Sequence, residues 1–292
     1  MSAKKLSGAE PLIGAHMSTS GGMDQAPARG SDVGCRCIQI FTKSNMQWAA
    51  RPLEEKEIQG FRDNCDKLGI WPVVAHNSYL INLSAADEAL ALKSLDSLVM
   101  EMERCRALGL PSLIMHPGSH ADTQAGLRLV AEALNRVIER TKDSPVKVLL
   151  ETTAGQGTNL GHRFEELAEI IGKVECQERM GVCMDTCHVF AAGYDLRTPE
   201  VYARTMAEFD KVIGLKRLQA FHFNDAKQGL GSRIDRHEHI GEGHLGTGAF
   251  RLILKDSRFA KVPKVLETPK GMKGEEDWDA VSLKLLRKLA AS

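Results

Sequence analysis

The feature that most constrains this chain is an alternation that runs from one end to the other. Eight short, β-rich apolar runs lie at residues 12–16, 37–42, 73–76, 113–116, 148–151, 182–185, 218–222 and 262–267. The segments between them place apolar side chains at spacings of three and four, as in Leu127, Val130, Ala131 and Leu134, which is the period of an amphipathic helix. Eight strand–helix units in one series predict an α/β protein whose parallel strands close into a single-domain (β/α)8 TIM barrel.

An open, doubly wound sheet is the alternative arrangement of such units. It fits less well, because the first strand–helix turn, at residues 16–23, lacks the G-x-G-x-x-G fingerprint. The runs are also almost continuously apolar, as expected of parallel strands that are covered on both faces. We therefore expect one barrel domain at residues 11–292, preceded by a disordered tail at residues 1–10.

Two local signals predict helix boundaries. The Gly21-Gly22 pair indicates a turn before the first helix. The segment Ser84-Ala85-Ala86-Asp87 is a capping pattern, so the helix after the third run is predicted to begin there and to end near Gly109.

Composition indicates the cellular compartment of the protein and limits the classes of partner that it can bind. The chain has seven cysteines without a C-x-x-C pair, most of them in apolar segments, which favours a reduced, cytoplasmic protein. No apolar run approaches the roughly 18 residues of a membrane span, and the first ten residues lack the apolar core of a signal peptide. Lys and Arg together number 38, as do Asp and Glu. This balance, taken alone, argues against a strongly basic nucleic-acid-binding protein.

The carboxyl ends of the runs carry the chemistry, because active sites of (β/α)8 barrels lie at that end of the strands. The last six runs end in imidazoles and carboxylates, namely His76, His116, Glu151, Asp185, His222 and Glu267. Three more candidates follow nearby: His188 comes three residues after Asp185, and Asp235 and His237 alternate in a later loop. Alternation places the last two on the same side of an extended segment.

Nitrogen and oxygen ligands without sulfur suit zinc, manganese or iron. One ion needs about four ligands including water, so nine candidates predict two or three ions. Multinuclear sites of this kind serve phosphoester hydrolysis. The sequence leaves open the roles of His16, His239 and Cys187, although strand direction favours Asp185 and His188 over the thiol between them.

Several segments resemble the endonuclease IV family of apurinic/apyrimidinic (AP) endonucleases, also called deoxyribonuclease IV. The segment GVCMDTCHVFAAGYD at 181–195 is similar to the long signature of that family. Further similar blocks are HFNDAK at 222–227, DRHEHIGEG at 235–243, HNSYLINL at 76–83, and FTK at 41–43 with Gln47-Trp48. The resemblance extends over residues 11–290.

The resemblance implies a trinuclear zinc phosphodiesterase on the same barrel. The first zinc would be held by His76, His116 and Glu151; the second by Glu151, Asp185, His222 and Glu267; and the third by His188, Asp235 and His237. Manganese or iron is an alternative at some positions. Glu151 and Glu267 would be catalytic. The implied reaction is hydrolysis 5′ to an abasic site in duplex DNA, leaving a 3′-hydroxyl and a 5′-deoxyribose phosphate, together with trimming of blocked 3′ ends.

The same resemblance implies contacts to DNA by a monomer that is associated with the nucleoid in a bacterium. The contact residues would be Lys43, Met46, Gln47, Tyr79, Leu80, Lys227 and Arg236. Tyr79 and Leu80 would act as a wedge in the base stack, and the basic residues would contact phosphates. The chain departs from the family at Met46, where the bacterial prototype has arginine, and at Ala226, where serine is usual. The glycine-rich segment 241–246 is a further candidate for approaching a phosphate.

The main alternative is a sugar isomerase or epimerase on the same barrel. Such an enzyme uses one divalent ion held by about four residues, and Glu151, Asp185, His222 and Glu267 would be sufficient for it. This hypothesis leaves the other five candidate ligands unexplained.

Overall fold

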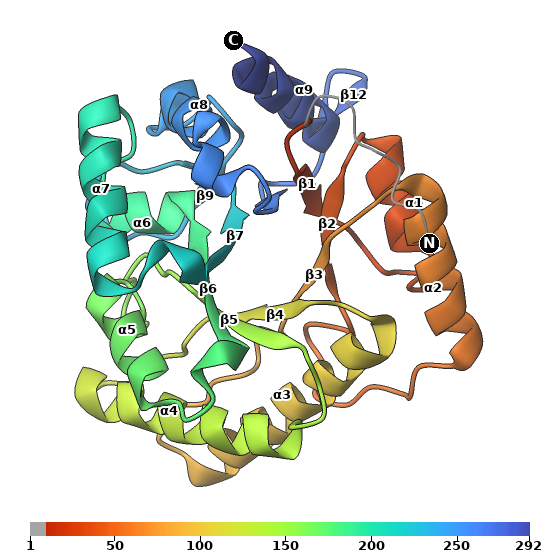
Figure 1. Ribbon diagram of the computed structural model, residues 1–292, viewed down its shortest axis with the longest axis vertical. Helices are drawn as coiled ribbons and strands as arrows, with labels where there is room; N and C mark the ends of the chain where they lie inside the picture. The colour runs from red at the N-terminus through yellow and green to blue at the C-terminus, as the bar shows by residue number, and fades with distance from the viewer. Residues whose placement is uncertain (1–9) are drawn as a thin grey trace.

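Eight parallel strands form a closed barrel in the computed structural model, which describes residues 10–292 (Figure 1). The strands are β1 (Ile13–His16), β2 (Cys37–Phe41), β3 (Val73–His76), β4 (Ser112–Met115), β5 (Lys147–Glu151), β6 (Met180–Asp185), β7 (Leu218–His222) and β10 (Lys264–Leu266). Each pairs in parallel with its neighbours, and β10 pairs with β1 to close the ring. The predicted TIM barrel is thus confirmed. The expected tail at residues 1–10 lies, apart from Glu10, outside the described residues.

The helices surround the barrel (Figure 1). They are α1 (Gln25–Asp32), α2 (Glu55–Leu68), α3 (Glu88–Leu108), α4 (Thr123–Arg140), α5 (Phe164–Lys173), α6 (Thr186–Ala192), α7 (Pro199–Val212), α8 (Gly246–Lys255) and α9 (Trp278–Ala291). Short strands pair as β8 (Asp225–Ala226) with β9 (His237–Glu238), and as β11 (Met272–Lys273) with β12 (Glu276–Asp277). No helix within residues 10–292 has the length and apolarity needed to cross a membrane.

One predicted helix boundary was wrong. Helix α3 begins at Glu88 rather than at Ser84, because Asp87 is the N-cap and its side chain accepts a hydrogen bond from Leu90 N at 2.8 Å. The Ser84 hydroxyl instead donates to the Asn82 side chain at 2.9 Å. The helix ends before Gly109, which has a left-handed φ of 77° as a C-cap, in agreement with the prediction.

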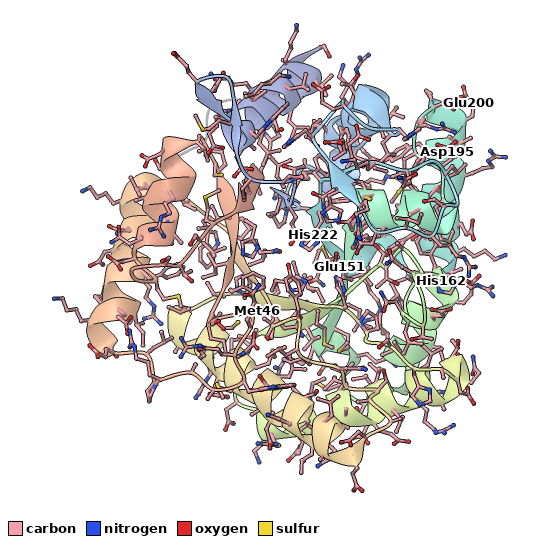
Figure 2. All side chains as sticks on the ribbon, turned by 180° about the vertical axis from the view of Figure 1, so that it is seen from behind. Met46, Glu151, His162, Asp195, Glu200 and His222 are labelled. Atoms are coloured by element: carbon pink, nitrogen blue, oxygen red, sulfur yellow. The ribbon has the colours of Figure 1, made fainter. Side chains whose placement is uncertain are left out.

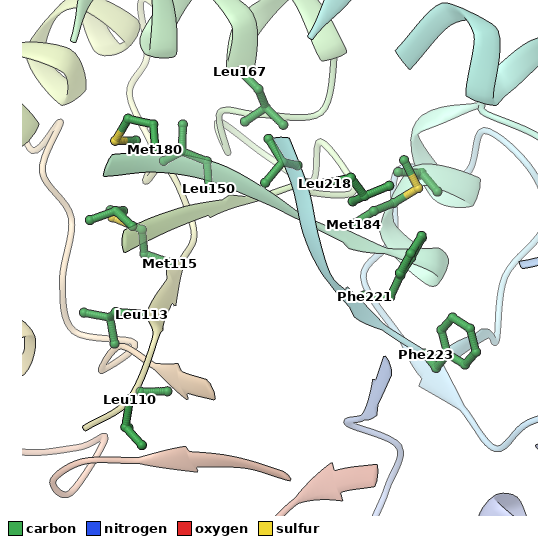
Figure 3. Packing of buried hydrophobic residues seen from close by; sticks show 14 of the residues in the cluster. Leu110, Leu113, Met115, Leu150, Leu167, Met180, Met184, Leu218, Phe221 and Phe223 are labelled. Carbon is green, nitrogen blue, oxygen red and sulfur yellow. The ribbon is translucent and has the colours of Figure 1, made fainter. Parts of the chain in front are cut away.

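The core has two parts, one on each face of the sheet. The larger part lies between strands and helices, where Leu113, Met115, Leu150 and Leu167 pack together (Figure 3). The smaller part contains strand residues only, one from each of seven strands: Cys37, Val74, Ile114, Leu149, Cys183, Ala220 and Val265. The eighth strand contributes Gly14, where an added Cβ would lie 1.6 Å from the Cys37 carbonyl oxygen. We call these eight residues the inner layer.

Candidate metal centre

The inner layer explains why polar side chains gather at one end of the barrel. Side chains of a strand alternate between the two faces of a sheet. The residue two positions after each member of the inner layer therefore belongs to the same, inward face. Those eight residues are His16, Gln39, His76, His116, Glu151, Asp185, His222 and Glu267. Six of them are predicted metal ligands, and Figure 2 shows Glu151 and His222 near the middle of the barrel.

The candidate ligands form three groups that are close enough to hold ions. The groups are His76, His116 and Glu151; Glu151, Asp185, His222 and Glu267; and Asp185, His188 and His237. The first two match the predicted ligand sets. The third contains Asp185 as well as the two predicted histidines, and the Asp235 carboxylate lies 3.1 Å from His188 Nε2 and 3.5 Å from His237 Nε2. The structure thus brings all nine predicted ligands together.

Hydrogen bonds outside the centre fix which ring nitrogen faces inward in three of the candidate histidines. His76 and His188 each place Nδ1 at 2.8 Å from a backbone carbonyl oxygen, of Asn77 and Thr152 respectively. His237 Nδ1 lies 3.2 Å from the Glu267 carbonyl. Because a carbonyl oxygen only accepts, these nitrogens carry the hydrogen in the neutral ring. Each Nε2 then presents a lone pair to the centre, as expected of a metal ligand.

These inward lone pairs face other acceptors. His76 Nε2 lies 3.1 Å from Glu151 Oε2, and His188 Nε2 lies 3.3 Å from His237 Nε2. Two acceptors at such a distance need a cation between them, either a proton or a metal ion. A buried set of imidazole and carboxylate donors fits divalent ions of the zinc class.

The electrostatics of the centre also favour cations. Burial alone would raise the pKa of Glu151, but the charges of His222 and His116 hold it well below its ordinary value. Burial alone would lower the pKa of His188, yet Asp185, Asp235 and Glu151 raise it well above the usual range. The Glu151 carboxylate therefore stays ionised, and it stabilises positive charge on whatever occupies the space beside it.

Gln39 is a further residue of the candidate site, and the sequence analysis missed it. Its side chain is fully buried, and Nε2 lies 2.6 Å from Glu267 Oε1 and 3.0 Å from His16 Nδ1. Its Oε1 lies 2.7 Å from His222 Nε2. The amide thus donates to a carboxylate and accepts from an imidazole, so it fixes two candidate ligands at once. The polar residue within the run Ile38-Gln39-Ile40 was the available signal.

Asn224 and Asp225 support the centre in different ways. Asn224 Nδ2 donates to Asp185 Oδ2 at 2.6 Å, and its Oδ1 accepts from Glu267 N at 2.9 Å. Asp225 accepts hydrogen bonds from the backbone N–H groups of residues 226, 241, 245 and 246. The glycine-rich segment 241–246, expected to approach a phosphate, thus turns three of its amides toward an internal carboxylate.

Three residues whose roles were open lie outside the ligand groups. Gln39 lies against His16, and burial lowers the pKa of this imidazole to about 3. Burial raises the pKa of the Cys187 thiol to about 12, and its Sγ faces the Arg236 carbonyl at 3.5 Å. His239 stacks on Trp278 with ring centroids 3.7 Å apart.

Most of the predicted DNA-contact residues are exposed or half-buried, and Lys43 alone among them is buried. Met46 is 69% exposed and Tyr79 59% exposed. Gln47, Lys227 and Arg236 are also exposed, and Leu80 is half-buried.

Lys43 is placed differently from what a phosphate contact requires. Its side chain is only 1% exposed, and Nζ lies 3.3 Å from Glu101 Oε1. Glu101 already neutralises this ammonium inside the protein.

Comparisons with known proteins agree with this geometry. A family model described as a xylose isomerase-like TIM barrel matches residues 27–289. The probable endonuclease 4 of Geobacter sulfurreducens is 50% identical over 95% of this chain and 94% of its own length. The crystal structure of endonuclease IV from Thermus thermophilus matches with a TM-score of 0.85 and 36% identity, covering 96% of this chain and 99% of that chain.

A more distant match concerns the fold alone. D-psicose 3-epimerase from Clostridium cellulolyticum matches with a TM-score of 0.65 and 14% identity, covering 96% of this chain and 95% of that chain. The near-complete coverage at about half identity is the decisive finding. The chain therefore belongs to the endonuclease IV family.

Proposed function

We propose that this protein is a DNA repair endonuclease that hydrolyses the phosphodiester 5′ to an abasic site in duplex DNA. Its products are a 3′-hydroxyl and a 5′-deoxyribose phosphate, and it also trims blocked 3′ ends. The observation that carries the proposal is the joining of three ligand groups at one barrel rim through the shared residues Glu151 and Asp185. Relatives named endonuclease 4 support a nucleic-acid substrate.

The three groups would hold three Zn²⁺ ions per chain, with Asp235 assigned to the third; Mn²⁺ and Fe²⁺ share these ligand preferences. Bound ions would supply a water nucleophile that is active at neutral pH and positive charge for the leaving oxygen. Glu151 directs Oε2 toward His76 and His116, at 3.1 and 3.2 Å, and Oε1 toward His222, at 2.9 Å. Its two oxygens therefore serve two different groups, which is the arrangement that a bridging ligand needs.

Glu267 lies closer to the solvent than Glu151, the other carboxylate expected to be catalytic. Its Oε2 lies 3.1 Å from His222 Nδ1, while the Gln39 amide holds Oε1. The Glu267 side chain is 14% exposed, whereas that of Glu151 is fully buried. A phosphate that enters from the rim would thus meet Glu267 before Glu151.

Two neighbouring loops present side chains to the DNA in this proposal. Met46 with Gln47 follows β2, and Tyr79 with Leu80 follows β3. Apolar and aromatic wedges at such positions unstack base steps and help to extrude a nucleotide. An abasic nucleotide costs less to extrude because it has lost its base. The exposed Lys227 and Arg236 would contact phosphates.

The balanced charge of the chain is compatible with this proposal. Three divalent ions would add six positive charges to a formal net charge of zero, and they would concentrate at the rim where phosphate binds. Affinity for abasic duplex should therefore fall when the ions are removed by a chelator, and it should return when Zn²⁺ is added back. Equal affinity of the metal-free and metal-loaded proteins would contradict this expectation.

The direct test is incision of a duplex that carries one synthetic abasic site, with metal content measured on the same preparation. We expect about three zinc-class ions per chain and a single nick 5′ to the site. A Glu267→Gln variant should keep most DNA binding and lose nicking, whereas Glu208→Gln is the control on an exposed face of α7. One ion per chain with ketose epimerisation and no nicking would favour the sugar epimerase.

The cellular context is part of the same proposal. All seven cysteines are free, and six of them are buried, which supports a reducing compartment such as the cytoplasm. We propose a monomeric enzyme that associates with the nucleoid in a bacterial cell. Sedimentation of the purified, metal-loaded protein with and without abasic duplex would test the oligomeric state.

A further inference from the structure

A buried ion pair lies beneath the two loops that are proposed to face DNA. Lys43 follows β2, and Glu101 belongs to α3. Their side chains are each 1% exposed, and Nζ lies 3.3 Å from Oε1. Neither residue belongs to the three ligand groups. The pair is therefore a buried charged feature that the proposed chemistry does not use.

Each member of the pair also binds the backbone of a DNA-facing loop. Lys43 Nζ donates to the carbonyl oxygens of Gln47 at 2.5 Å and Ser44 at 3.4 Å. The Glu101 carboxylate accepts from Ser78 N, with its two oxygens at 3.3 and 3.2 Å. One loop thus folds over the ammonium and the other over the carboxylate.

A direct bond and a second α3 side chain complete the connection. The Ser78 hydroxyl donates to the Asn45 carbonyl at 2.7 Å, which joins the two loops to each other. Arg104, one turn after Glu101, donates from Nε to the Thr42 carbonyl at 2.7 Å and from Nη1 to the Arg51 carbonyl at 2.8 Å. Helix α3 therefore holds the loop after β2 at its start and its end, and Lys43, paired with Glu101, holds the middle of the loop at Gln47.

Stability alone is a poor explanation for such a pair. Moving two charges out of water costs several kcal/mol per ion, and well-packed apolar residues often replace a buried pair without loss of stability. What an apolar pair does not offer is a set of directed bonds to loop carbonyl and amide groups. The bonds that Lys43 and Glu101 make specify where the two loops stand relative to each other.

We propose that Lys43 and Glu101 are positioning residues that hold the loops bearing Met46 and Tyr79 in one fixed relation, so that both side chains enter the same DNA site together. This inference rests on the proposed function, because it takes the two loops as the DNA-facing surface. It replaces the expected role of Lys43 as a direct phosphate contact. The two roles differ in what they predict for salt dependence and for small substrates.

The test compares Lys43→Met, Glu101→Gln and the double variant, with Lys67→Met on the exposed face of α2 as the control. Steady-state incision of abasic duplex is measured beside hydrolysis of bis(p-nitrophenyl) phosphate, which is too small to need the loops. Metal content and Tm are recorded for every protein. We expect KM for the duplex to rise by about tenfold to a hundredfold in either single variant, with hydrolysis of the small ester and metal content unchanged.

Coupling and salt dependence decide between the two roles. If the pair acts as one device, the double variant should be no worse than either single variant. If Lys43 contacted a phosphate, Lys43→Met would instead make the plot of log K against log salt less steep by about one unit, and Glu101→Gln would stay near wild type. That result, or additive effects, would overturn the proposal. So would a parallel loss of Tm and of small-ester hydrolysis.

A milder variant guards against misfolding. Ser78→Ala removes the hydroxyl that reaches Asn45 without disturbing the buried charges. It should raise the duplex KM by a smaller factor at unchanged Tm, and an unchanged KM would count against coupled loops. Failure of the wild-type protein to nick abasic duplex would refute the proposed function itself. The variants test only the positioning role, so the two failures can be told apart.

Discussion

Replacement of Gln39 by leucine tests how the centre is held together. Leucine has similar bulk but no amide, so the variant removes the donor to Glu267 Oε1 and the acceptor of His222 Nε2–H, contacts of 2.6 and 2.7 Å. Groups that hold metal ligands in this way typically contribute tenfold to a hundredfold in metal affinity, which corresponds to about 1.4–2.8 kcal/mol. We expect a loss of this size at the group that contains both ligands.

The loss should be confined to one ion. Gln39 contacts neither His76 and His116 nor His188 and His237. Titration of the zinc-loaded protein with a competing chelator should therefore release one ion per chain earlier than in wild type. The other ions should be retained as before, apart from what they lose through the shared ligands Glu151 and Asp185. Nicking of abasic duplex should fall with the early ion.

Two further variants make the test specific. Gln39→Glu keeps the size but places a carboxylate against Glu267, so the repulsion should make it at least as weak a binder as the leucine variant. Gln124→Leu changes an exposed glutamine of α4 and should leave all ions in place. An unchanged release curve for Gln39→Leu, or equal weakening of every ion, would refute the reasoning.

Three other predictions follow from local geometry. Gly243→Ala places a Cβ 2.5 Å from both Ala226 O and Asp225 Oδ1, so we expect early loss of the proposed ion at His188 and His237 in a metal analysis. Gly229→Ala, in the loop between β8 and β9 with open space around it, should lose none. The hydrogen bond from Arg51 holds the pKa of Glu57 at about 2, below its ordinary 4.5, so the pair stabilises the protein above pH 4.5 and loses this effect as the pH falls through 2. Glu57→Gln should accordingly lower the free energy of unfolding by about 0.5–1 kcal/mol near pH 7, because this pair is partly solvent-exposed, and urea titrations should show the difference shrinking between pH 4.5 and pH 2; a constant difference would be contrary evidence. Met46→Arg adds a charge at a 69% exposed position and should steepen the salt dependence of duplex binding by about one unit of slope, whereas an unaltered slope would show that this side chain stays away from phosphate.

The sequence predicted most of the centre because the barrel repeats one simple rule. Apolar runs identify strands, and the inward residue beyond each run is where a polar group can reach the rim. This reasoning found His76, His116, Glu151, Asp185, His222 and Glu267. It missed the second strand, where the inward residue that reaches the centre is Gln39 and not a residue at the end of the run 37–42. Counting two residues on from Cys37 would have found it.

The positions of Lys43 and of the α3 start could not be inferred in the same way. The partner of Lys43 is Glu101, which lies on a helix that follows the next strand. Nothing local in the sequence distinguishes this lysine from one that faces solvent. Ser84 matches a capping pattern, but a local hydrogen bond with the Asn82 side chain and a tertiary one with the Ser119 carbonyl occupy its hydroxyl. A non-local contact decided the first case, and the local cap at Asp87 with the non-local bond of Ser84 decided the second.

The carboxylate of Asp225 has a consequence for how quickly the protein can take up ions. It binds amides at residues 226, 241, 245 and 246, so it closes the base of the long loop that carries Asp235 and His237. The chain entropy that closure of this loop costs is therefore lost during folding and not when an ion binds. An ion arriving at the proposed metal centre would therefore meet ligands that already stand opposite one another. A protein stripped of the proposed ions would then be reloaded without refolding of this loop.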